Sequence, residues 1–504
     1  METLQRTANR GSVSTAAYSI DNSVLLVGAN CEGEITQTAG DRKTHTISFW
    51  HKRAPIGPGS GAGELDGAGE DLWGTPSEGD TLRFGSSDLA FFHEGGTGSS
   101  LVTDRKFRDC SAWYHFVVAI DTTQAVAANR IKIYVNGVQE TSFSTETYPD
   151  EDDEFKLMEN SQVFRIGAGH GGTTSATGQG YNADFIIVDG AAKAASDFGE
   201  FNDDGIWVPK EYTGDFNTGS GTNGAHYKFA GAAEGTGAGS TGLDSSGNSN
   251  NMNFENQKGG LTDTPTNNFC TLNPNDMTAN ATYRPDITLG NLKFEPTGSG
   301  SSTIRGTMGM SSGKWYWEVK VATNTNGAVG VGTANAVVPV TTSQEGGVMW
   351  ASPTGDTHSF DMYANSHFYS RMSRAGTGNS TQVAYASGTM DAGMIMSVAY
   401  DADNQDIYLA KAGSWTDVVS GQDPTQGGGT DTAYTYHSYF NNDEDNIWLP
   451  TFTEPYNQDM EVNFGNPIHA ITSGNADANG YGNFEYAVPS GYYALCTKNI
   501  AEFG

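Results

Sequence analysis

Three carboxylates, Glu64, Asp66 and Glu70, lie close together in the sequence and are the nearest approach to a pair that could cleave a glycosidic bond. That reaction needs two carboxyl groups at a set separation across a cleft. Here they lie in a glycine-rich stretch that predicts a loop. No Ser/His/Asp order and no Walker-type phosphate loop stands out elsewhere. We therefore expect that the chain is not an enzyme, with a polysaccharide-degrading glycoside hydrolase as an alternative.

The densest acidic cluster runs from Asp150 through Glu151, Asp152 and Asp153 to Glu154. Adjacent like charges repel one another unless something neutralises them. One interpretation is a solvated acidic loop, which is the commoner state of charged side chains. The other is a Ca²⁺ site with oxygen ligands from Asp150, Asp152, Asp153 and Glu154, although the spacing is not that of an EF-hand. Calcium is the one cofactor that the sequence suggests.

Two further segments are rich in side-chain oxygens. Asp244, Asn248 and Asn250 form one of them, and turn formation explains these residue types better than a metal does. The run from Asn442 to Asp445 is the other, and we expect it to be solvated.

Recognition of a sugar needs an aromatic face for the apolar side of the ring, and polar groups for its hydroxyls. The aromatic residues that fall in predicted loops and could serve are Trp73, His93, Trp350, Tyr363, Phe368, Tyr369 and Trp415. Partly buried packing is the commoner role for each of them. The tryptophans in strand patterns, Trp50, Trp113, Trp315 and Trp317, are predicted to lie in a core.

The composition of the chain indicates many short strands joined by turns. Of 504 residues, 65 are Gly, aromatic residues make up 11% and charged residues 17%. A disordered chain would have few aromatic residues. The length suffices for two or three domains. The best helical candidate is the short stretch around Ala191–Phe198.

The net charge of -32 comes from 27 basic and 59 acidic residues. Nucleic-acid binding needs a basic surface, and adhesion to anionic lipid needs one too, so neither partner is expected. The ordinary consequence of such charge is solubility.

The segment 1–15 carries Arg6 and Arg10 with only Glu2 opposing them. It is either a frayed terminus or an arm that docks on a neighbouring subunit. The segment lacks the apolar stretch of a secretory signal, and no run of the chain has the length of a membrane span. We therefore expect folding in a cytoplasm and release by another route, such as particle assembly followed by lysis.

The four cysteines, Cys31, Cys110, Cys270 and Cys496, do not form the paired spacing of a zinc site. A Cys31–Cys110 disulfide is possible. Free buried thiols are the favoured state.

Alternating apolar residues predict strands in two blocks. In the first, Trp113–Asp121 has a dense apolar face, and Arg130–Val135 is followed by Asn136-Gly137. Asn-Gly between alternating strands is a strong hairpin signal. In the second block, Lys314–Val321 is the clearest strand, and Met394–Tyr400 forms a hairpin with Asp406–Leu409.

The first block resembles the laminin-G/concanavalin A-like jelly rolls. The resemblance rests on Thr46–Trp50 followed by His51–Arg53, then Trp113–Val118, then Ile133–Gly137, and it covers residues 18–200. It implies an antiparallel β-sandwich, and relatives of this kind often bind calcium at a loop rim.

The segment Leu243–Asn250 looks like the element that usually opens such a module, but here it follows the module. A circular permutation would explain this order, because the termini of a domain often lie close together. In that case His226–Phe254 adds back onto the first sandwich, and Phe229 and Phe254 must reach its core.

The second block looks like a SPRY module, which is another concanavalin-like sandwich, over residues 280–498. The segments that carry the resemblance are Gly313–Val319, Val329–Gly332, Ser397–Asp401, Ile407–Leu409, Leu449–Pro450 and Asn463–Gly465. Ala412-Gly413 stands where the family usually has Asn-Gly.

The sequence thus predicts an all-β chain of two antiparallel jelly-roll sandwiches. Its parts are an arm at 1–15, a laminin-G-like sandwich at 16–212, a Gly/Asn-rich connector with short strands at 213–275, and a SPRY-like sandwich at 276–504.

Several short sequence segments, taken together with the two blocks, resemble those of structural proteins of bacteriophage particles. These segments are Phe107–Asp109, Ala112–Tyr114, Trp207–Lys210, Pro265–Asn267 and Cys270–Pro274. The resemblance implies a protein of the virion surface that contacts other virion proteins. The favoured function is a lectin-like adhesin of a tail fibre or tail tip that binds a host glycan or protein. A capsid-decoration or tail-joining protein is the alternative. Homo-oligomers are expected, since weak sites gain from multivalency.

Overall fold

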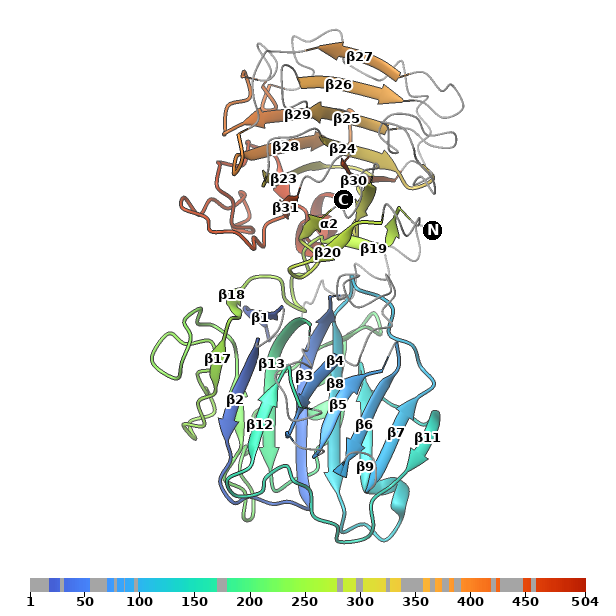
Figure 1. The fold of residues 1–504 in the computed structure, drawn as a ribbon, viewed down its shortest axis with the longest axis vertical. Helices are drawn as coiled ribbons and strands as arrows, with labels where there is room; N and C mark the ends of the chain where they lie inside the picture. Colours follow the sequence, from blue (N-terminus) through green and yellow to red (C-terminus); the bar gives the residue numbers. More distant parts are fainter. Residues whose placement is uncertain are drawn as a thin grey trace. The chain divides into compact units, whose positions relative to one another are not determined.

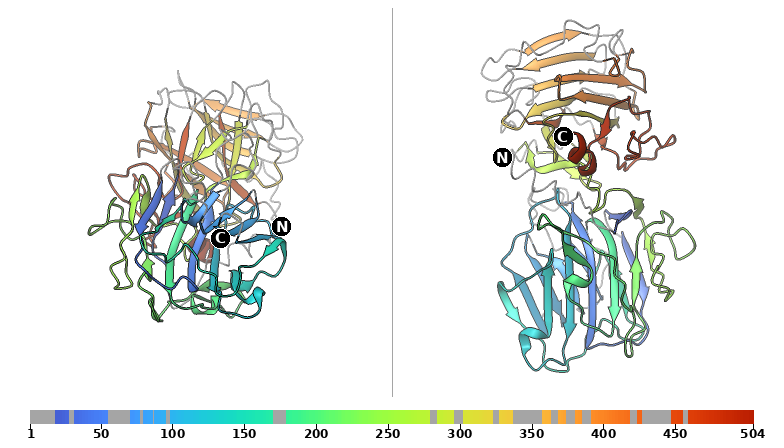
Figure 2. Two further views of the ribbon diagram at one scale, coloured as in Figure 1. Left: turned by 60° about the horizontal axis from the view of Figure 1, so that its bottom comes forward. Right: turned by 180° about the vertical axis from the view of Figure 1, so that it is seen from behind.

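The computed structural model describes residues 18–27, 31–54, 70–76, 79–85, 87–94, 98–169, 179–278, 284–295, 302–322, 327–336, 357–362, 368–373, 380–384, 391–417, 423–426, 447–454 and 459–504. The chain divides into two compact units, one built from Arg10–Asn268 and one from Phe269–Gly504. Both are made of antiparallel sheets, so the predicted all-β class is confirmed (Figures 1 and 2).

The first unit consists of two eight-stranded sheets. Sheet I has the order β10-β9-β8-β3-β13-β1-β18, and β16 pairs with β13. Its strands are β1 (Ser23–Leu26), β3 (Thr44–Arg53), β8 (Tyr114–Asp121), β9 (Ile131–Val135), β10 (Val138–Gln139), β13 (Gly180–Asp189), β16 (Ala225–Tyr227) and β18 (Lys258–Leu261).

Sheet II has the order β11-β7-β6-β5-β4-β12-β2-β17, and several of these strands run side by side in Figure 1. Its strands are β2 (Glu32–Thr36), β4 (Glu70–Gly74), β5 (Thr81–Phe84), β6 (Leu89–His93), β7 (Ser99–Thr103), β11 (Phe143–Thr147), β12 (Val163–Ile166) and β17 (Asn253–Glu255).

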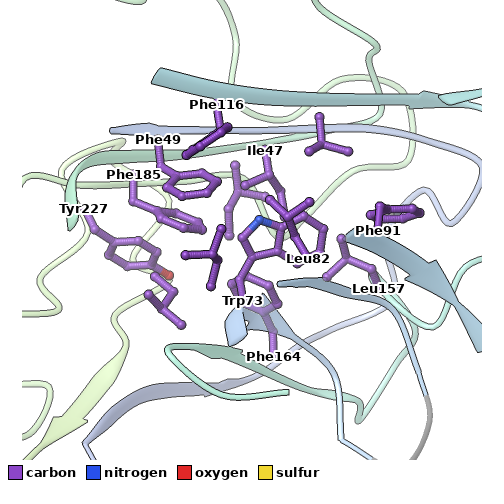
Figure 3. Packing of buried hydrophobic residues seen from close by; sticks show 14 of the residues in the cluster. Ile47, Phe49, Trp73, Leu82, Phe91, Phe116, Leu157, Phe164, Phe185 and Tyr227 are labelled. Atoms are coloured by element: carbon purple, nitrogen blue, oxygen red, sulfur yellow. The ribbon is translucent and has the colours of Figure 1, made fainter. Parts of the chain in front are cut away.

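The core of the first unit lies between the two sheets, because alternate residues of each strand point to one face. Phe49, Phe116 and Phe185 come from sheet I, and Leu82 and Phe164 come from sheet II. Figure 3 shows Trp73 among them, surrounded by side chains of both sheets.

The segment that was expected to be a connector completes both sheets of the first unit. Its β16 pairs with β13, β17 pairs with β2, and β18 pairs with β1. Phe229 and Phe254 belong to the core cluster, with their ring centroids 5.8 Å apart. The condition set by the permutation hypothesis is therefore met, and the first unit ends at Asn268.

The outer face of sheet I is covered by a short hairpin of β14 (Gly199–Phe201) and β15 (Trp207–Pro209). The Trp207 ring stacks at 5.9 Å on His115, which in turn stacks at 4.7 Å on Trp50. Trp50 and His115 are 4% and 1% exposed. These two side chains of β3 and β8 would otherwise face solvent, so the hairpin creates a second buried layer.

The hairpin turn predicted at Asn136-Gly137 joins β9 to β10 and is confirmed. Both residues have positive φ, at 48° and 79°, as a type I′ turn requires. A Cβ at Gly137 would lie 2.3 Å from the Trp207 ring. Glycine is needed here both for the backbone angle and for the approach of Trp207.

The second unit also has two sheets. Sheet III has the order β19-β22-β30-β24-β25-β26-β27, and sheet IV has the order β20-β21-β31-β23-β28-β29, with β32 parallel to β23. The strands of sheet III are β19 (Leu272–Met277), β22 (Ser302–Gly306), β24 (Gly327–Thr333), β25 (Thr357–Met362), β26 (Phe368–Ser373), β27 (Ser380–Ala384) and β30 (Trp448–Glu454). The strands of sheet IV are β20 (Asp286–Thr288), β21 (Lys293–Glu295), β23 (Lys314–Val321), β28 (Ile395–Asp401), β29 (Asp406–Lys411), β31 (Met460–Asn463) and β32 (Tyr493–Ala494).

The strand predicted over Lys314–Val321 is β23, and the predicted hairpin is β28–β29. Trp317 is fully buried, and its ring centroid lies 6.3 Å from that of Phe464. Trp50, Trp113 and Trp315 are also buried, so the predicted burial of these tryptophans is confirmed, although Trp50 lies in the outer layer under His115.

Helices are few in the described residues. Ala195–Asp197 is a 3₁₀ turn within the stretch that was predicted as helical. The α-helix α2 (Thr497–Phe503) was not predicted; its seven residues make only about two turns, too short for a clear helical periodicity. No described helix has the length and apolarity needed to cross a bilayer.

We predict that Trp207→Ala destabilises the first unit by about 3–5 kcal/mol, because it uncovers Trp50 and leaves His115 without its indole donor. Phe201→Ala is the matched control: Phe201 lies in the same hairpin but is 54% exposed. Urea unfolding followed by hydrogen exchange of β3 and β8 peptides measures the effect. Equal effects of the two substitutions would contradict the covering role of Trp207.

Candidate ligand-binding surface

Ser48 and His115 form a buried pair on the outer face of sheet I that has the residue types of a nucleophile and its base. Ser48 Oγ lies 2.9 Å from His115 Nε2. Trp207 Nε1 donates to His115 Nδ1 at 3.0 Å, so the ring proton of the neutral imidazole must be on Nε2. Burial lowers the pKa of His115 to about 3. His115 therefore donates to Ser48 and cannot activate it as a base.

Glu70, the described member of the candidate hydrolase triplet, is enclosed in an ion pair. Its Oε2 accepts from Arg53 Nη2 at 2.8 Å and from Arg53 Nε at 3.1 Å, and its Oε1 lies 3.6 Å from His51 Nε2. Burial would raise the pKa of Glu70, but Arg53 and His51 outweigh burial and lower it. Glu70 is 4% exposed, so it serves as a counterion rather than as an acid facing a cleft. Glu64 and Asp66 lie outside the described residues.

A second buried cluster joins the core to the acidic loop. His93 Nδ1 lies 2.5 Å from Asp80 Oδ1, and His93 Nε2 lies 3.4 Å from Asp153 Oδ2. The other oxygen of Asp80 accepts from the backbone N–H of Leu157 at 2.5 Å. The His93 ring stacks on Phe155 at 4.1 Å. The cluster fixes the segment that follows the acidic loop to the end of β6.

Each carboxylate of the acidic loop that makes an ion pair does so with a separate cation of the protein. Lys43 contacts Asp152 at 3.1 Å, Arg42 contacts Glu154 at 2.8 Å, and Arg130 contacts Glu151 at 3.6 Å, while Asp153 faces His93. These cations offset the charge that Ca²⁺ would balance in the second of the two interpretations.

In the part of the chain that the structure describes, no three acidic, His or Cys side chains converge as a metal site. Asp150, Asp152, Asp153 and Glu154, the ligands of the calcium interpretation, are not among such groups, and the described contacts of their loop are ion pairs.

The oxygen-rich run at Asp244 forms a turn, as expected. Asp244 accepts from the backbone N–H groups of His226, Ser246 and Asn250 at 2.8–3.0 Å. With its oxygens used in this way, the carboxylate closes the loop between β16 and β17. The run at Asn442–Asp445 lies outside the described residues.

The outer face of sheet II is the remaining broad face of the first unit. Leu82, Phe91 and Leu101 point into the core, so the alternating residues between them point outward. Among the outward residues, Thr81 of β5 is 1% exposed and Arg83 of β5 is part-exposed, whereas Thr145 and Thr147 of β11 are exposed. We call the outward residues Arg83, Phe92, Ser100, Val102, Thr145 and Thr147 the β5–β11 face.

Phe92 is the aromatic side chain of the β5–β11 face. Its cross-strand neighbours are Thr81 and Ser100, which are small, so the half-buried ring is not covered by a bulky neighbour in its row. Arg83 lies diagonally beside it, 3.4 Å from the Asp71 carboxylate. An apolar ring, hydroxyls and a guanidinium on one face are the groups that recognise a sugar or an acidic sugar.

On sheet IV of the second unit, Glu318 holds the covering segment Glu485–Tyr486 by hydrogen bonds, and an open depression lies beside it. Glu318 of β23 accepts from Tyr316, Asn463 and the backbone N–H groups of Glu485 and Tyr486, and it is fully buried. Burial raises the pKa of Glu318, and these hydrogen bonds oppose the rise.

Lys320 lies two residues after Glu318 in β23, on the same face of the sheet. It lines a depression of ≈ 380 Å³ together with Ala322, Ala392, Gly393 and Glu461. Lys320 and Glu461 are cross-strand partners with their charges 3.6 Å apart. The His469 hydrogen bond lowers the pKa of Glu461. This depression has charges of both signs but no aromatic lining, so it is a weaker candidate for a sugar than the β5–β11 face.

The aromatic residues proposed as ligand contacts fall in different places. Trp73 lies in β4 and His93 in β6, and both are fully buried, so their prediction as surface loop residues is wrong. A bulge in the β4–β5 pairing turns both Leu72 and Trp73 into the core. Trp415 is half-buried and packs against the core cluster that covers sheet IV.

Tyr369 and Phe368 lie in β26. Trp350, Tyr363, Arg6 and Arg10 lie outside the described residues. Phe92 is an aromatic residue of the candidate surface that was not among the predicted ligand contacts. The alternation in Leu89–His93, with Leu89 and Phe91 inward, was the signal that places Phe92 outward.

We predict that the His93 cluster makes stability fall as pH rises. Burial alone lowers the pKa of His93, but the hydrogen bond to Asp80 and the charges of Asp80, Asp153 and Glu94 outweigh it and raise the pKa. When the pKa of a histidine is higher in the folded than in the unfolded state, its protonation stabilises the fold. The stabilisation is complete below the unfolded-state pKa of about 6.5 and is lost as the pH rises through the folded-state pKa. The urea midpoint should therefore drop over that range.

Asp153→Asn should flatten this pH dependence, and Asp152→Asn, which removes a carboxylate paired with Lys43, should not. Buried His45, whose pKa burial lowers, titrates in both variants and cancels in the comparison. Identical slopes for wild type and Asp153→Asn would contradict the assignment.

Comparison with known proteins matches part of the first unit to a family model. Residues 30–195 match the model of the concanavalin A-like lectin/glucanases superfamily. No curated protein matches the chain. The SPRY domain of human HERC1 aligns at 11% identity with a TM-score of 0.24, covering 40% of this chain and 99% of that domain.

A native heptameric SAP-like pentraxin from Limulus polyphemus aligns at 13% identity and a TM-score of 0.24, over 35% of this chain and 80% of its own. The TRIM65 PSpry domain aligns at 11% identity with a TM-score of 0.25, and the alignment covers 38% of this chain and 88% of that domain. Scores this low carry no information on ligands. The family match is the firm result: over residues 30–195 the chain contains a concanavalin A-like lectin/glucanase domain of the laminin G type.

Proposed function

We propose that the chain is a non-enzymatic binding protein of a virion surface, and that the β5–β11 face of its laminin G-type domain binds a host glycan. The supporting observation is the contrast between the two outer faces of the first unit. The face of sheet I is covered by Trp207 at His115 and Trp50, whereas the face of sheet II carries the part-exposed ring of Phe92, the part-exposed guanidinium of Arg83, which pairs with Asp71, and the exposed hydroxyl of Thr145.

The family description covers both lectins and glucanases, so the fold is compatible with binding or with hydrolysis of carbohydrate. The described polar clusters favour binding. Glu70 is neutralised by Arg53, and Ser48 accepts a hydrogen bond from His115 instead of donating one to it. Neither group is arranged as a general acid or as a nucleophile facing solvent.

The phage assignment rests on the linked phrases of the sequence, and the position on the particle follows from the proposed binding role. A tail fibre or tail tip would display the β5–β11 face towards a host cell. Several copies would raise the avidity of a weak sugar site. The net charge of -32 keeps such a displayed protein soluble.

We predict that Phe92→Ala weakens binding to a glycan identified on an array by about 1–2 kcal/mol, which is roughly a ten-fold rise in Kd, because a sugar loses its stacking surface. Val163→Ala is the matched control, since Val163 is a half-buried outward residue of β12 away from Phe92. Isothermal titration with the purified protein measures both. Equal losses, or no loss in Phe92→Ala, would remove the β5–β11 face from consideration.

We predict that the protein releases no reducing ends from the glycan that it binds, and that Glu64→Gln leaves this result unchanged. A colorimetric reducing-sugar assay with long incubation provides the measurement. Release by the wild type that Glu64→Gln abolishes would establish a glycoside hydrolase. A protein with no glycan ligand that is present in many copies per particle would instead be a capsid-decoration or tail-joining protein.

A further inference from the structure

Lys52, near the end of β3, is a lysine with no exposed surface. Its Nζ lies 2.9 Å from Asp263 Oδ2 and 2.7 Å from Asn268 Oδ1. Lys52 and Asp263 are 0% exposed and Asn268 is 4% exposed. Lysine and aspartate are rarely buried to this degree, so the three side chains form an unusual cluster.

The surroundings of the cluster are aromatic and exclude water. Trp113 Nε1 donates to Asp263 Oδ1 at 3.2 Å, and Lys52 Nζ lies 5.7 Å from the centre of the Tyr181 ring. Trp113 and Tyr181 are buried as well. In such a medium charged groups are costly to bury, so each of them needs close polar partners.

The geometry presents the asparagine amide to the lysine. Asn268 Nδ2 donates to the carbonyl of Ser111 at 2.6 Å, which leaves Oδ1, and with it Cγ, facing Lys52 Nζ. The segment that supplies Asp263 and Asn268 is itself fixed, because Ser23 Oγ donates to the carbonyl of Asp263 and Thr266 Oγ1 donates to the carbonyl of Ile20, both at 2.7 Å.

We propose that Lys52 and Asn268 become joined by an intramolecular amide bond, with Asp263 as the acid–base group. Asp263 accepts a proton from the Lys52 ammonium, which frees the amine. Nζ attacks Cγ of Asn268, while the protonated Asp263 donates to the developing oxyanion.

The bond between Cγ and Nδ2 then breaks. The overall change converts a lysine ammonium and a primary amide into a secondary amide and an ammonium ion, and Asp263 returns to the carboxylate. No oxidant, reductant or other co-reactant takes part.

The fold supplies what this slow reaction needs. Fixed contact between the amine and the carbonyl gives a high effective concentration. A carboxylic acid at hydrogen-bonding distance supplies general acid–base catalysis. Departure of ammonia makes the reaction irreversible in practice, since the buried amide is shielded from hydrolysis.

The bond would join positions 216 residues apart in the sequence and tie the last residue of the first unit to the central strands of sheet I. Tension between the N-terminal strands and the second unit would pass through the amide, and the chain between Lys52 and Asn268 would not extend. The inference stands on this cluster alone and does not depend on the glycan site.

The test is the intact mass of the full-length wild-type protein, measured under denaturing and reducing conditions. We expect a mass lower than that of the sequence by one molecule of ammonia, and a branched tryptic peptide in which Lys52 is joined to Asn268. The four cysteines are free, so disulfides do not complicate the measurement. A wild-type mass equal to that of the sequence, with unbranched peptides, would overturn the proposal.

Variants separate the amide from other losses of ammonia, such as succinimide formation at Asn136-Gly137. Asp263→Asn and Lys52→Arg should both restore the full mass and remove the branched peptide. Lys43→Arg, at a lysine that is paired with Asp152 at the surface, should keep both signatures. An ammonia loss that persists in Lys52→Arg would overturn the proposal. The wild-type peptide map decides the matter even where a variant fails to fold.

Discussion

Burial of the outward faces of the central strands is the constraint on which both units depend. A two-sheet sandwich has its core between the sheets, and the outer face of each sheet must then either be covered by another segment or be exposed to solvent. In the first unit the face of sheet I is closed by the β14–β15 hairpin, with Trp207 over His115. In the second unit the face of sheet IV is closed by the C-terminal segment, with Phe484 packed edge-on at 4.9 Å against Tyr316. A buried polar group fixes each cover, through the Trp207–His115 hydrogen bond in one case and through Glu318 in the other.

These polar groups show why residue type alone is a poor guide to chemistry in this chain. Ser48 with His115, Glu70 with Arg53, and Asp80 with His93 each look like a catalytic pair. In each pair the proton positions, or an opposing charge, are already fixed by neighbours. Buried polar groups must be satisfied, and the same contacts that satisfy them remove their reactivity.

The Lys52 cluster differs from these pairs because it includes the side-chain amide of Asn268, whose nitrogen can leave as ammonia. Asp263 and Asn268 both lie within hydrogen-bonding distance of one amine. A cross-link there and a binding site on the β5–β11 face would use opposite sides of the first unit's architecture: Lys52 belongs to sheet I, and Phe92 belongs to sheet II. The two proposals, a cross-link and a recognition surface, thus concern different sheets of one sandwich.

The sequence by itself determined the all-β class, the Asn136-Gly137 hairpin and the core tryptophans, because these follow from local alternation and turn chemistry. It also indicated that Phe229 and Phe254 return to the first core, through the misplaced Leu243–Asn250 element.

Tertiary structure decided the rest. Trp73 is buried because of a bulge, and the acidic loop is neutralised by Arg42, Lys43, Arg130 and His93, which come from distant parts of the chain. Lys52 meets its partners only when the end of the first unit returns to β3. No local pattern encodes a contact between residues so far apart in the sequence, since it depends on how whole strands are ordered in a sheet.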